Sequence, residues 1–176
     1  MATISDDVRP VLSRTPGIVR GLIEGAPAAA LNFHERTGAW SPVEVLCHLA
    51  DGEITDWVPR LELMLSGSQP ARFQPFDREG GLGRYAGWPA ARLLDEFEQL
   101  RARNLARLDA LRIVDADSER TAVHPDPDLG TVTLTQLLAC WAVHDLAHVA
   151  QITRSLVRHR GPEVGPWRKY FSLLSD

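Results

Sequence analysis

The segment between Thr133 and Arg160 constrains the fold more than any other part of the chain. Its apolar residues recur every three or four positions, which is the period of a helix with one buried face. Thr133 and Gln136 form a capping box that predicts the start of this helix, and Gly161-Pro162 predicts its end. A helix of about seven turns must bury one face along its whole length, so the sequence predicts that it packs among other helices.

Two further segments have the same helical period. The first runs from about Ser5 to Gly25 and either kinks at Pro16 or restarts there with Thr15 as its cap. The other follows Pro89 and carries apolar residues at helical spacing as far as Leu111. Both are predicted to be amphipathic helices.

One more helix, the second in chain order, is predicted to start at Ser41, which forms a capping box with Glu44. Its apolar positions continue to about Leu65, and Pro59 is expected to bend it. The next segment, 66–88, is rich in glycine and proline. It is longer than most bundle connections, which suggests a crossover or a loop that covers a site.

These elements predict an all-α fold, a four-helix bundle, with one domain over residues 1–176. No segment shows the two-residue period of a strand, and 112–132 is expected to be a polar linker. The C-terminal residues are expected to add one short helical turn. Three aromatic residues of this turn are expected to pack on the body: Trp167, Tyr170 and Phe171.

Charge and composition narrow the class of protein. The net charge of −4 argues against a general nucleic-acid or anionic-membrane binder, because Lys and Arg are not in excess. No apolar run approaches the roughly 20 residues of a membrane-spanning helix, and the acidic start is unlike a signal peptide. The two cysteines do not form a disulfide framework. We expect a cytoplasmic protein.

His144 and His148 lie four residues apart on the apolar stripe of the last helix. This spacing lets both imidazoles point to one place, and buried imidazoles need a metal ion, hydrogen bonds or water. Zinc or nickel would require a third protein ligand, for which His48, on the buried side of the second helix, is the best candidate. The alternative is a hydrogen-bonded core cluster without an ion.

Several other residues are candidates for the same site. Asp51 could orient the second-helix histidine or act as a catalytic base, and Asp145 could contact another helix or lie on the polar surface. Gln151 continues the histidine stripe and could bind a ligand. Arg84 and Tyr85 could contact substrate if the long loop closes over the site.

The chain resembles the DinB superfamily of damage-inducible bacterial proteins. The resemblance is carried by 40–53 and 130–154, which contain the histidines, and by the loop and third-helix stretch 76–104. It implies a four-helix bundle with unusual connectivity, often a homodimer. It also implies a divalent metal ion, held by one histidine of the second helix and two of the last. In this sequence these are His48, His144 and His148.

Some members of this superfamily are metal-dependent enzymes that use low-molecular-weight thiols such as mycothiol or bacillithiol. The resemblance therefore implies a transferase that activates a thiol, or water, for attack on a small electrophile. The alternative is a non-catalytic bundle that binds a metal ion or a small molecule, with an unknown role in the stress response. We expect the protein to bind a small-molecule substrate and to bind neither nucleic acid nor a membrane.

Overall fold

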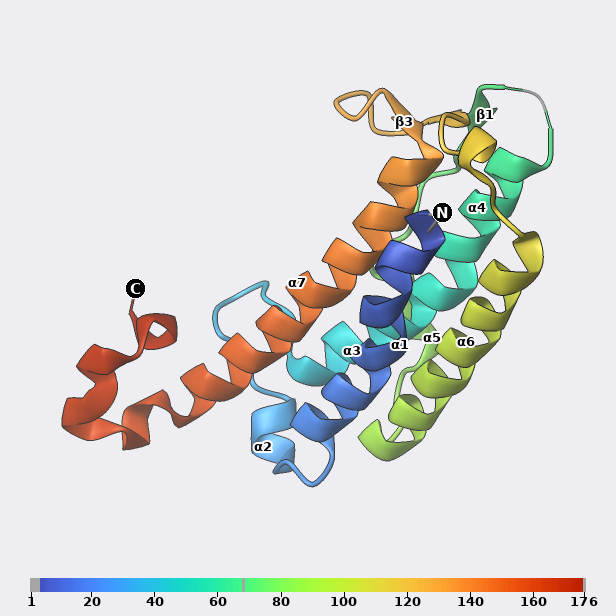
Figure 1. The fold of residues 1–176 in the computed structure, drawn as a ribbon. Coiled ribbons are helices and arrows are strands. Elements are labelled where there is room, and N and C mark those ends of the chain that lie inside the picture. The colour runs from blue at the N-terminus through green and yellow to red at the C-terminus, as the bar shows by residue number, and fades with distance from the viewer. Residues whose placement is uncertain (1–3, 68, 176) are drawn as a thin grey trace.

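The structure is a computed structural model that describes residues 4–67 and 69–175 (Figure 1). The chain forms an all-α four-helix bundle, which confirms the predicted fold class. Its long helices are α1 (Ile4–Ile23), α3 (Pro42–Thr55) with its continuation α4 (Trp57–Leu65), α6 (Ala90–Leu111) and α7 (Leu134–Arg160). Both predicted capping boxes are present, at Ser41 and at Thr133.

Of the long helices that follow each other in the chain, α1 and α3 lie diagonally across the bundle, as do α6 and α7, whereas α3 and α6 pack side by side. The main interfaces are those of α1 with α6 and α7, and of α3 with the same two helices. The connection from α1 to α3, which contains the short α2 (Ala28–Leu31), therefore crosses one end of the bundle (Figure 1). This order makes α3 and α7 neighbours, although they are far apart in the sequence.

The two helices with internal prolines behave differently. Helix α1 runs through Pro16 without a restart, and Thr15 bonds back to the Val11 carbonyl instead of capping a new helix. The α3–α4 helix is interrupted at Asp56, three residues before Pro59. Because a proline ring clashes with the carbonyl four residues earlier, here that of Thr55, the interruption falls there.

The prediction that the chain has no strands was wrong. Two long connections meet in a small sheet, in which β1 (Ala71–Arg72) is parallel to β2 (Thr121–Val123), and β2 is antiparallel to β3 (Thr131–Thr133). The sheet lies at one end of the bundle (Figure 1). Strands this short are held by tertiary contacts and leave almost no periodic signal in the sequence.

The loop between α4 and α6 contains α5 (Gly80–Arg84), which packs against α3. A Cβ atom on Gly81 would lie 2.6 Å from the Cys47 carbonyl oxygen. Only glycine permits this close approach of two backbones. The loop is thereby fixed against the helix that carries His48.

The C-terminal residues form three short 3₁₀ turns, η2 (Gly161–Glu163), η3 (Gly165–Tyr170) and η4 (Ser172–Leu174). A further 3₁₀ turn, η1 (Asp115–Asp117), follows α6. The prediction that the aromatic residues of the tail pack on the body was wrong. Trp167, Tyr170 and Phe171 are 67%, 71% and 50% exposed, and Leu174 is the buried contact. The turns project from the end of α7, and η2 and η4 pack against that helix (Figure 1).

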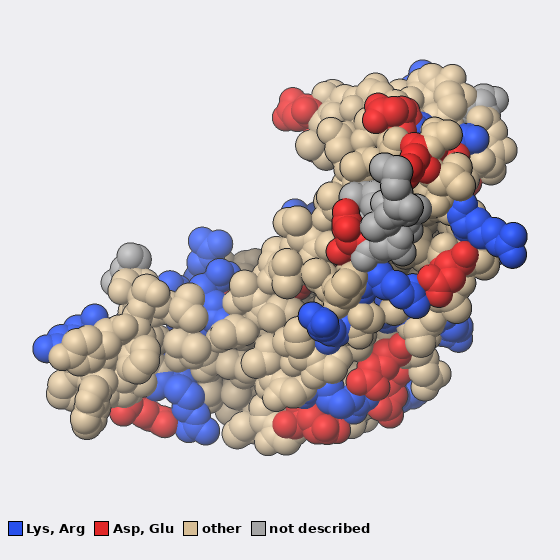
Figure 2. Space-filling model, in the orientation of Figure 1, with Lys and Arg blue, Asp and Glu red and all other residues tan. Residues whose placement is uncertain are grey.

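The core has two apolar clusters. One joins α1, α4, α6, α7 and the sheet, and the other joins α1, α2, α3, α6 and α7 with Tyr85, which follows α5. Acidic and basic side chains are mixed over the face seen in Figure 2. In the described part of the chain, no helix is long and apolar enough to span a membrane.

Candidate metal centre

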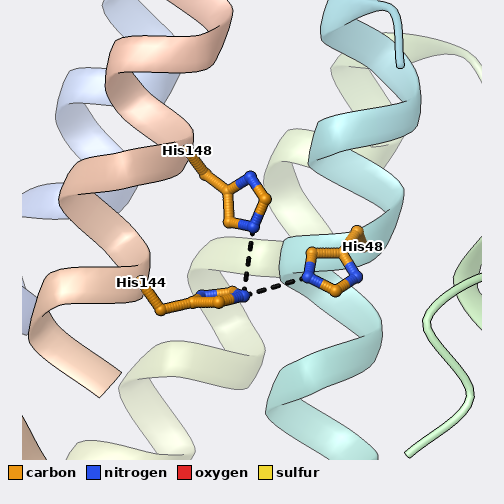
Figure 3. A group of neighbouring side chains, drawn as sticks. All are labelled: His48, His144 and His148. Atoms are coloured by element: carbon orange, nitrogen blue, oxygen red, sulfur yellow. Dashed lines mark hydrogen bonds between the residues drawn. The ribbon is translucent and has the colours of Figure 1, made fainter. Parts of the chain in front are cut away.

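The three predicted histidines meet between α3 and α7. His48 projects from α3, while His144 and His148 project from successive turns of α7, and all three point to one place (Figure 3). The Nε2 atom of His144 lies 2.9 Å from Nε2 of His48 and 3.1 Å from Nε2 of His148. All three ligand atoms lie within 4.8 Å of one another.

In two of these rings, the hydrogen bond made by Nδ1, the nitrogen that faces away from the centre, determines which nitrogen carries the proton. His48 Nδ1–H donates to the Arg78 carbonyl oxygen, at 3.3 Å, and His148 Nδ1–H donates to Gln151 Oε1, at 2.9 Å. A neutral imidazole has one proton, so the Nε2 atoms of both rings carry lone pairs that face the centre. Such hydrogen bonds from the outer nitrogen are typical of metal-binding histidines.

Hydrogen bonds alone do not satisfy this cluster. A proton on His144 Nε2 can be donated to only one of the two lone pairs beside it. Nδ1 of His144 is buried and has no hydrogen-bond partner among the described residues. A divalent cation would instead accept all three lone pairs. Ligand nitrogens of a tetrahedral zinc site lie about 3.3 Å apart, close to the distances here, so the residues fit such an ion.

The surroundings keep the imidazoles neutral, which is the form that binds metal. Burial, reinforced by the neighbouring His148, lowers the pKa of His48 to about 4 and that of His144 to about 2. Burial also lowers the pKa of His148, although the hydrogen bond that His148 donates to Gln151 acts in the opposite direction. At neutral pH none of the three needs to lose a proton before it binds a cation.

Aromatic rings surround the histidines. The Trp40 ring packs on His48 and His148, with centroids at 4.8 Å and 6.4 Å, and the Trp57 ring meets the edge of His144 at 5.0 Å. Phe76, from the loop after α4, packs on His48 at 5.6 Å. These contacts hold the rings in place and lower the local dielectric constant, which strengthens charge interactions at the site.

A buried ionic network beside the histidines joins all four helices. Arg101 of α6 donates to both carboxylate oxygens of Asp145, at 2.5 Å and 3.0 Å, to Glu53 Oε1 at 2.8 Å, and to the Leu12 carbonyl oxygen at 2.8 Å. All three charged side chains are at most 1% exposed. Asp145 follows His144, and Glu53 lies on the helix of His48, so this network sets the register of α3 against α7.

Two cavities meet at the histidine cluster. The apolar cavity, of about 560 Å³, contains all three histidines and is lined mainly by Trp57, Phe73, Phe76, Leu129 and Leu137. The polar cavity, of about 360 Å³, reaches His148 from the other side and is lined by Glu35, Arg36, Trp40, Gln151 and Arg154. His148 and Arg78 border both cavities.

Of the other candidate residues, the structure brings Gln151 and Asp145 to this centre but not Asp51, Arg84 or Tyr85. Gln151 orients His148, and Asp145 takes the first of its two predicted roles, a contact with another helix. Asp51 is paired with Arg84 at 2.6 Å, and both line a separate cavity next to α5. Tyr85 is 4% exposed and lies in the core against Trp88. The catalytic role of Asp51 and the substrate contacts of Arg84 and Tyr85 stay predictions.

Four neighbours of the site were missed by sequence reasoning. Arg101 and Glu53 look like the polar face of their helices, and Arg78 acts on His48 through its backbone carbonyl, which no side-chain pattern reveals. His124 lies in the segment expected to be a polar linker, but it is half-buried and lines the apolar cavity. The segment that separates β2 from β3 carries it there.

The fold and the site together define a helical bundle with a three-histidine centre between its second and last long helices. A sequence profile of the DinB superfamily matches residues 12–152. The chain belongs to the DinB superfamily.

Similar proteins come from several bacilli. One is named "Putative metal-dependent hydrolase YfiT", from Bacillus subtilis, and is 28% identical over 81% of this chain and 79% of its own length. A Bacillus licheniformis protein with the same designation is 29% identical, over 80% of this chain and 78% of its own length. The solved structure of YfiT, described as a probable metal-dependent hydrolase with an unusual four-helix bundle topology, has a TM-score of 0.75. It is 26% identical and matches 89% of this chain and 87% of its own.

Proposed function

We propose that this protein is a metal-dependent enzyme that activates a small nucleophile for attack on an electrophilic substrate. The observation that carries the proposal is the convergence of three imidazole Nε2 atoms at the end of an apolar cavity. His48, His144 and His148 would hold one divalent ion, with zinc and nickel as the expected metals. Such an ion would act as a Lewis acid and would lower the pKa of a bound water or thiol to about 7.

The residues of this chain prepare the site for that chemistry. Gln151 and the Arg78 carbonyl orient two of the ligand imidazoles, and the apolar cavity would bind the apolar part of the substrate beside them. The oxygen or sulfur of the nucleophile would form a bond to the electrophilic carbon, and the leaving group would depart with its bonding electron pair. The proton of the nucleophile would pass to the leaving group or to solvent.

The proposal has two forms, which differ in whether the nucleophile is water or a thiol. The names of the bacillus proteins favour water, and hence hydrolysis. A second observation favours a low-molecular-weight thiol, and hence an S-transferase: two cavities of different polarity meet at His148. A polar thiol and an apolar electrophile would then each have a cavity, whereas hydrolysis requires only one organic substrate.

Reconstitution tests both forms of the proposal. The protein is treated with a chelator, reloaded with zinc or nickel, and assayed on small esters and alkylating electrophiles, with and without a low-molecular-weight thiol. We expect turnover that requires metal and is lost in His148→Ala. Thiol-dependent turnover would favour the transferase. Bound metal without turnover in any assay would favour the alternative, a non-catalytic metal- or small-molecule-binding bundle.

A further inference from the structure

Arg78 provides an unpaired positive charge where the two cavities meet. Its side chain forms no ion pair with any carboxylate in the described part of the chain, and it borders both cavities beside His148. The other arginine of the apolar cavity, Arg60, is already paired, with 2.7 Å between its Nε and Asp56 Oδ1. Among the described residues that line this cavity, Asp56 is also the only acidic one. Among the arginines of this cavity, Arg78 is therefore the one whose charge is available to a bound anion.

The backbone of Arg78 is fixed relative to the histidines, and its exposed side chain extends towards Trp40. The Arg78 carbonyl accepts the His48 hydrogen bond, and its guanidinium carbon lies 5.7 Å from the centre of the Trp40 ring. That same ring packs on two of the three histidines. Gly81, three residues further on, anchors the segment against α3. The guanidinium thus lies next to the reaction centre, and a group bound to it would place the rest of a small molecule among the aromatic side chains.

We propose that Arg78 binds a carboxylate of the substrate, so that this protein acts on small molecules in which a carboxylate is joined to an apolar body. This inference rests on the proposed function and names its substrate class. A guanidinium pairs with a carboxylate through two parallel hydrogen bonds. One unpaired guanidinium balances one negative charge, which fits a carboxylate better than a doubly charged phosphate. The apolar body would lie against Trp57, Phe73 and Phe76.

Binding of matched neutral and charged probes tests the role of Arg78. Phenylacetate and 4-phenylbutyrate are compared with phenylacetamide and 4-phenylbutanamide, by titration calorimetry on the full chain with its metal. We expect at least one carboxylate to bind about tenfold or more tightly than its amide, since charge-assisted hydrogen bonds are the stronger kind. Arg78→Gln should remove this preference, Arg78→Lys should keep part of it, and the exposed control Arg14→Gln should leave it unchanged.

Two results would overturn the inference. One is a wild-type protein that prefers neither carboxylate over its amide. The other is an Arg78→Gln variant that keeps the full preference, because the carboxylate would then be held by the metal ion or by Arg60. Metal content, measured on the same samples, tests the proposed function separately. If the carboxylate preference persists in a metal-free His144→Ala variant, Arg78 is the anion site whether or not the metal reaction occurs.

Discussion

Two groups of buried polar side chains join α3 to α7, and they differ in how completely they are satisfied. In the Arg101 network, Glu53 accepts from Arg101, Asn104 and Trp141, and both oxygens of Asp145 accept from Arg101. In the histidine cluster, lone pairs face one another and Nδ1 of His144 has no partner among the described residues. In the first group the cation and the carboxylates all come from the chain, and within it only Arg101 Nε has no hydrogen-bond partner among the described residues. In the second group the three lone pairs can be satisfied together only by an added cation.

The difference separates a structural role from a binding role. A buried charge without a partner costs much free energy, so the network that holds the bundle together contains charges of both signs, Arg101 with Glu53 and Asp145. A site that takes up a cation must keep its lone pairs available until the ion arrives. Changes to the network should therefore alter stability, and changes to the cluster should alter metal binding.

The largest effect is expected from Arg101→Leu, which leaves the carboxylates of Glu53 and Asp145 buried without their cation. We expect a loss of about 3–5 kcal/mol in the free energy of unfolding, measured by urea denaturation. Arg103→Leu, on the same helix but 65% exposed at its side chain, is the matched control and should change stability little. Equal stability of the Arg101→Leu variant and wild type would contradict the structural role of the network.

Gln151→Leu tests the orientation of the cluster without removing a ligand. Because the His148 Nδ1–H loses its acceptor, metal affinity should fall about 10–100-fold, while the free energy of unfolding of the metal-free protein changes little. Competition with a chromophoric chelator measures the affinity. Gln99→Leu, an exposed change on α6, serves as the control. Unchanged affinity in Gln151→Leu would show that this hydrogen bond does not support the site.

The pH dependence of stability tests whether the cluster is neutral when folded. The lowered pKa values of His48 and His144 mean that the unfolded chain binds more protons below pH 6.5 than the folded chain does. The free energy of unfolding of the metal-free protein should therefore fall from pH 7 to pH 5, by up to about 1.4 kcal/mol per pH unit for each histidine.

Urea denaturation at a series of pH values measures this slope. His144→Leu should make it shallower, because one buried group no longer titrates. The exposed His34 offers a matched control, and His34→Leu should leave the slope as it is. A metal-free wild type whose stability is constant over this range would show that the histidines are as free to take up protons in the folded state as in the unfolded one.

The smallest effect is expected from Arg84→Gln, which breaks the pair with Asp51 outside both cavities. The Arg84 side chain is 46% exposed, so the change should cost less than about 1 kcal/mol of stability. Metal content, measured by plasma emission, should stay at the wild-type value. Loss of turnover with unchanged metal content would instead support the substrate contact predicted for Arg84 from the sequence.

The sequence allowed prediction of features that depend on local spacing. Ser41 with Glu44 and Thr133 with Gln136 are separated by one helical turn, so the helix starts could be read directly. His144 and His148 share a face for the same reason. The pairing of Arg101 with Glu53 and Asp145, and the contact of the Arg78 carbonyl, depend on how distant segments pack. The three strands also depend on such contacts, so they were not predictable from local pattern.

Metal content per chain shows directly whether His48, His144 and His148 bind a metal ion. Plasma emission on wild type and His144→Ala, both purified without a histidine tag and dialysed against zinc or nickel, measures it. We expect close to one equivalent of metal per chain in wild type and almost none in the variant, with the same helical circular dichroism in both. A wild-type protein that stays empty with each ion would contradict the account and would make the three histidines a hydrogen-bonded part of the core.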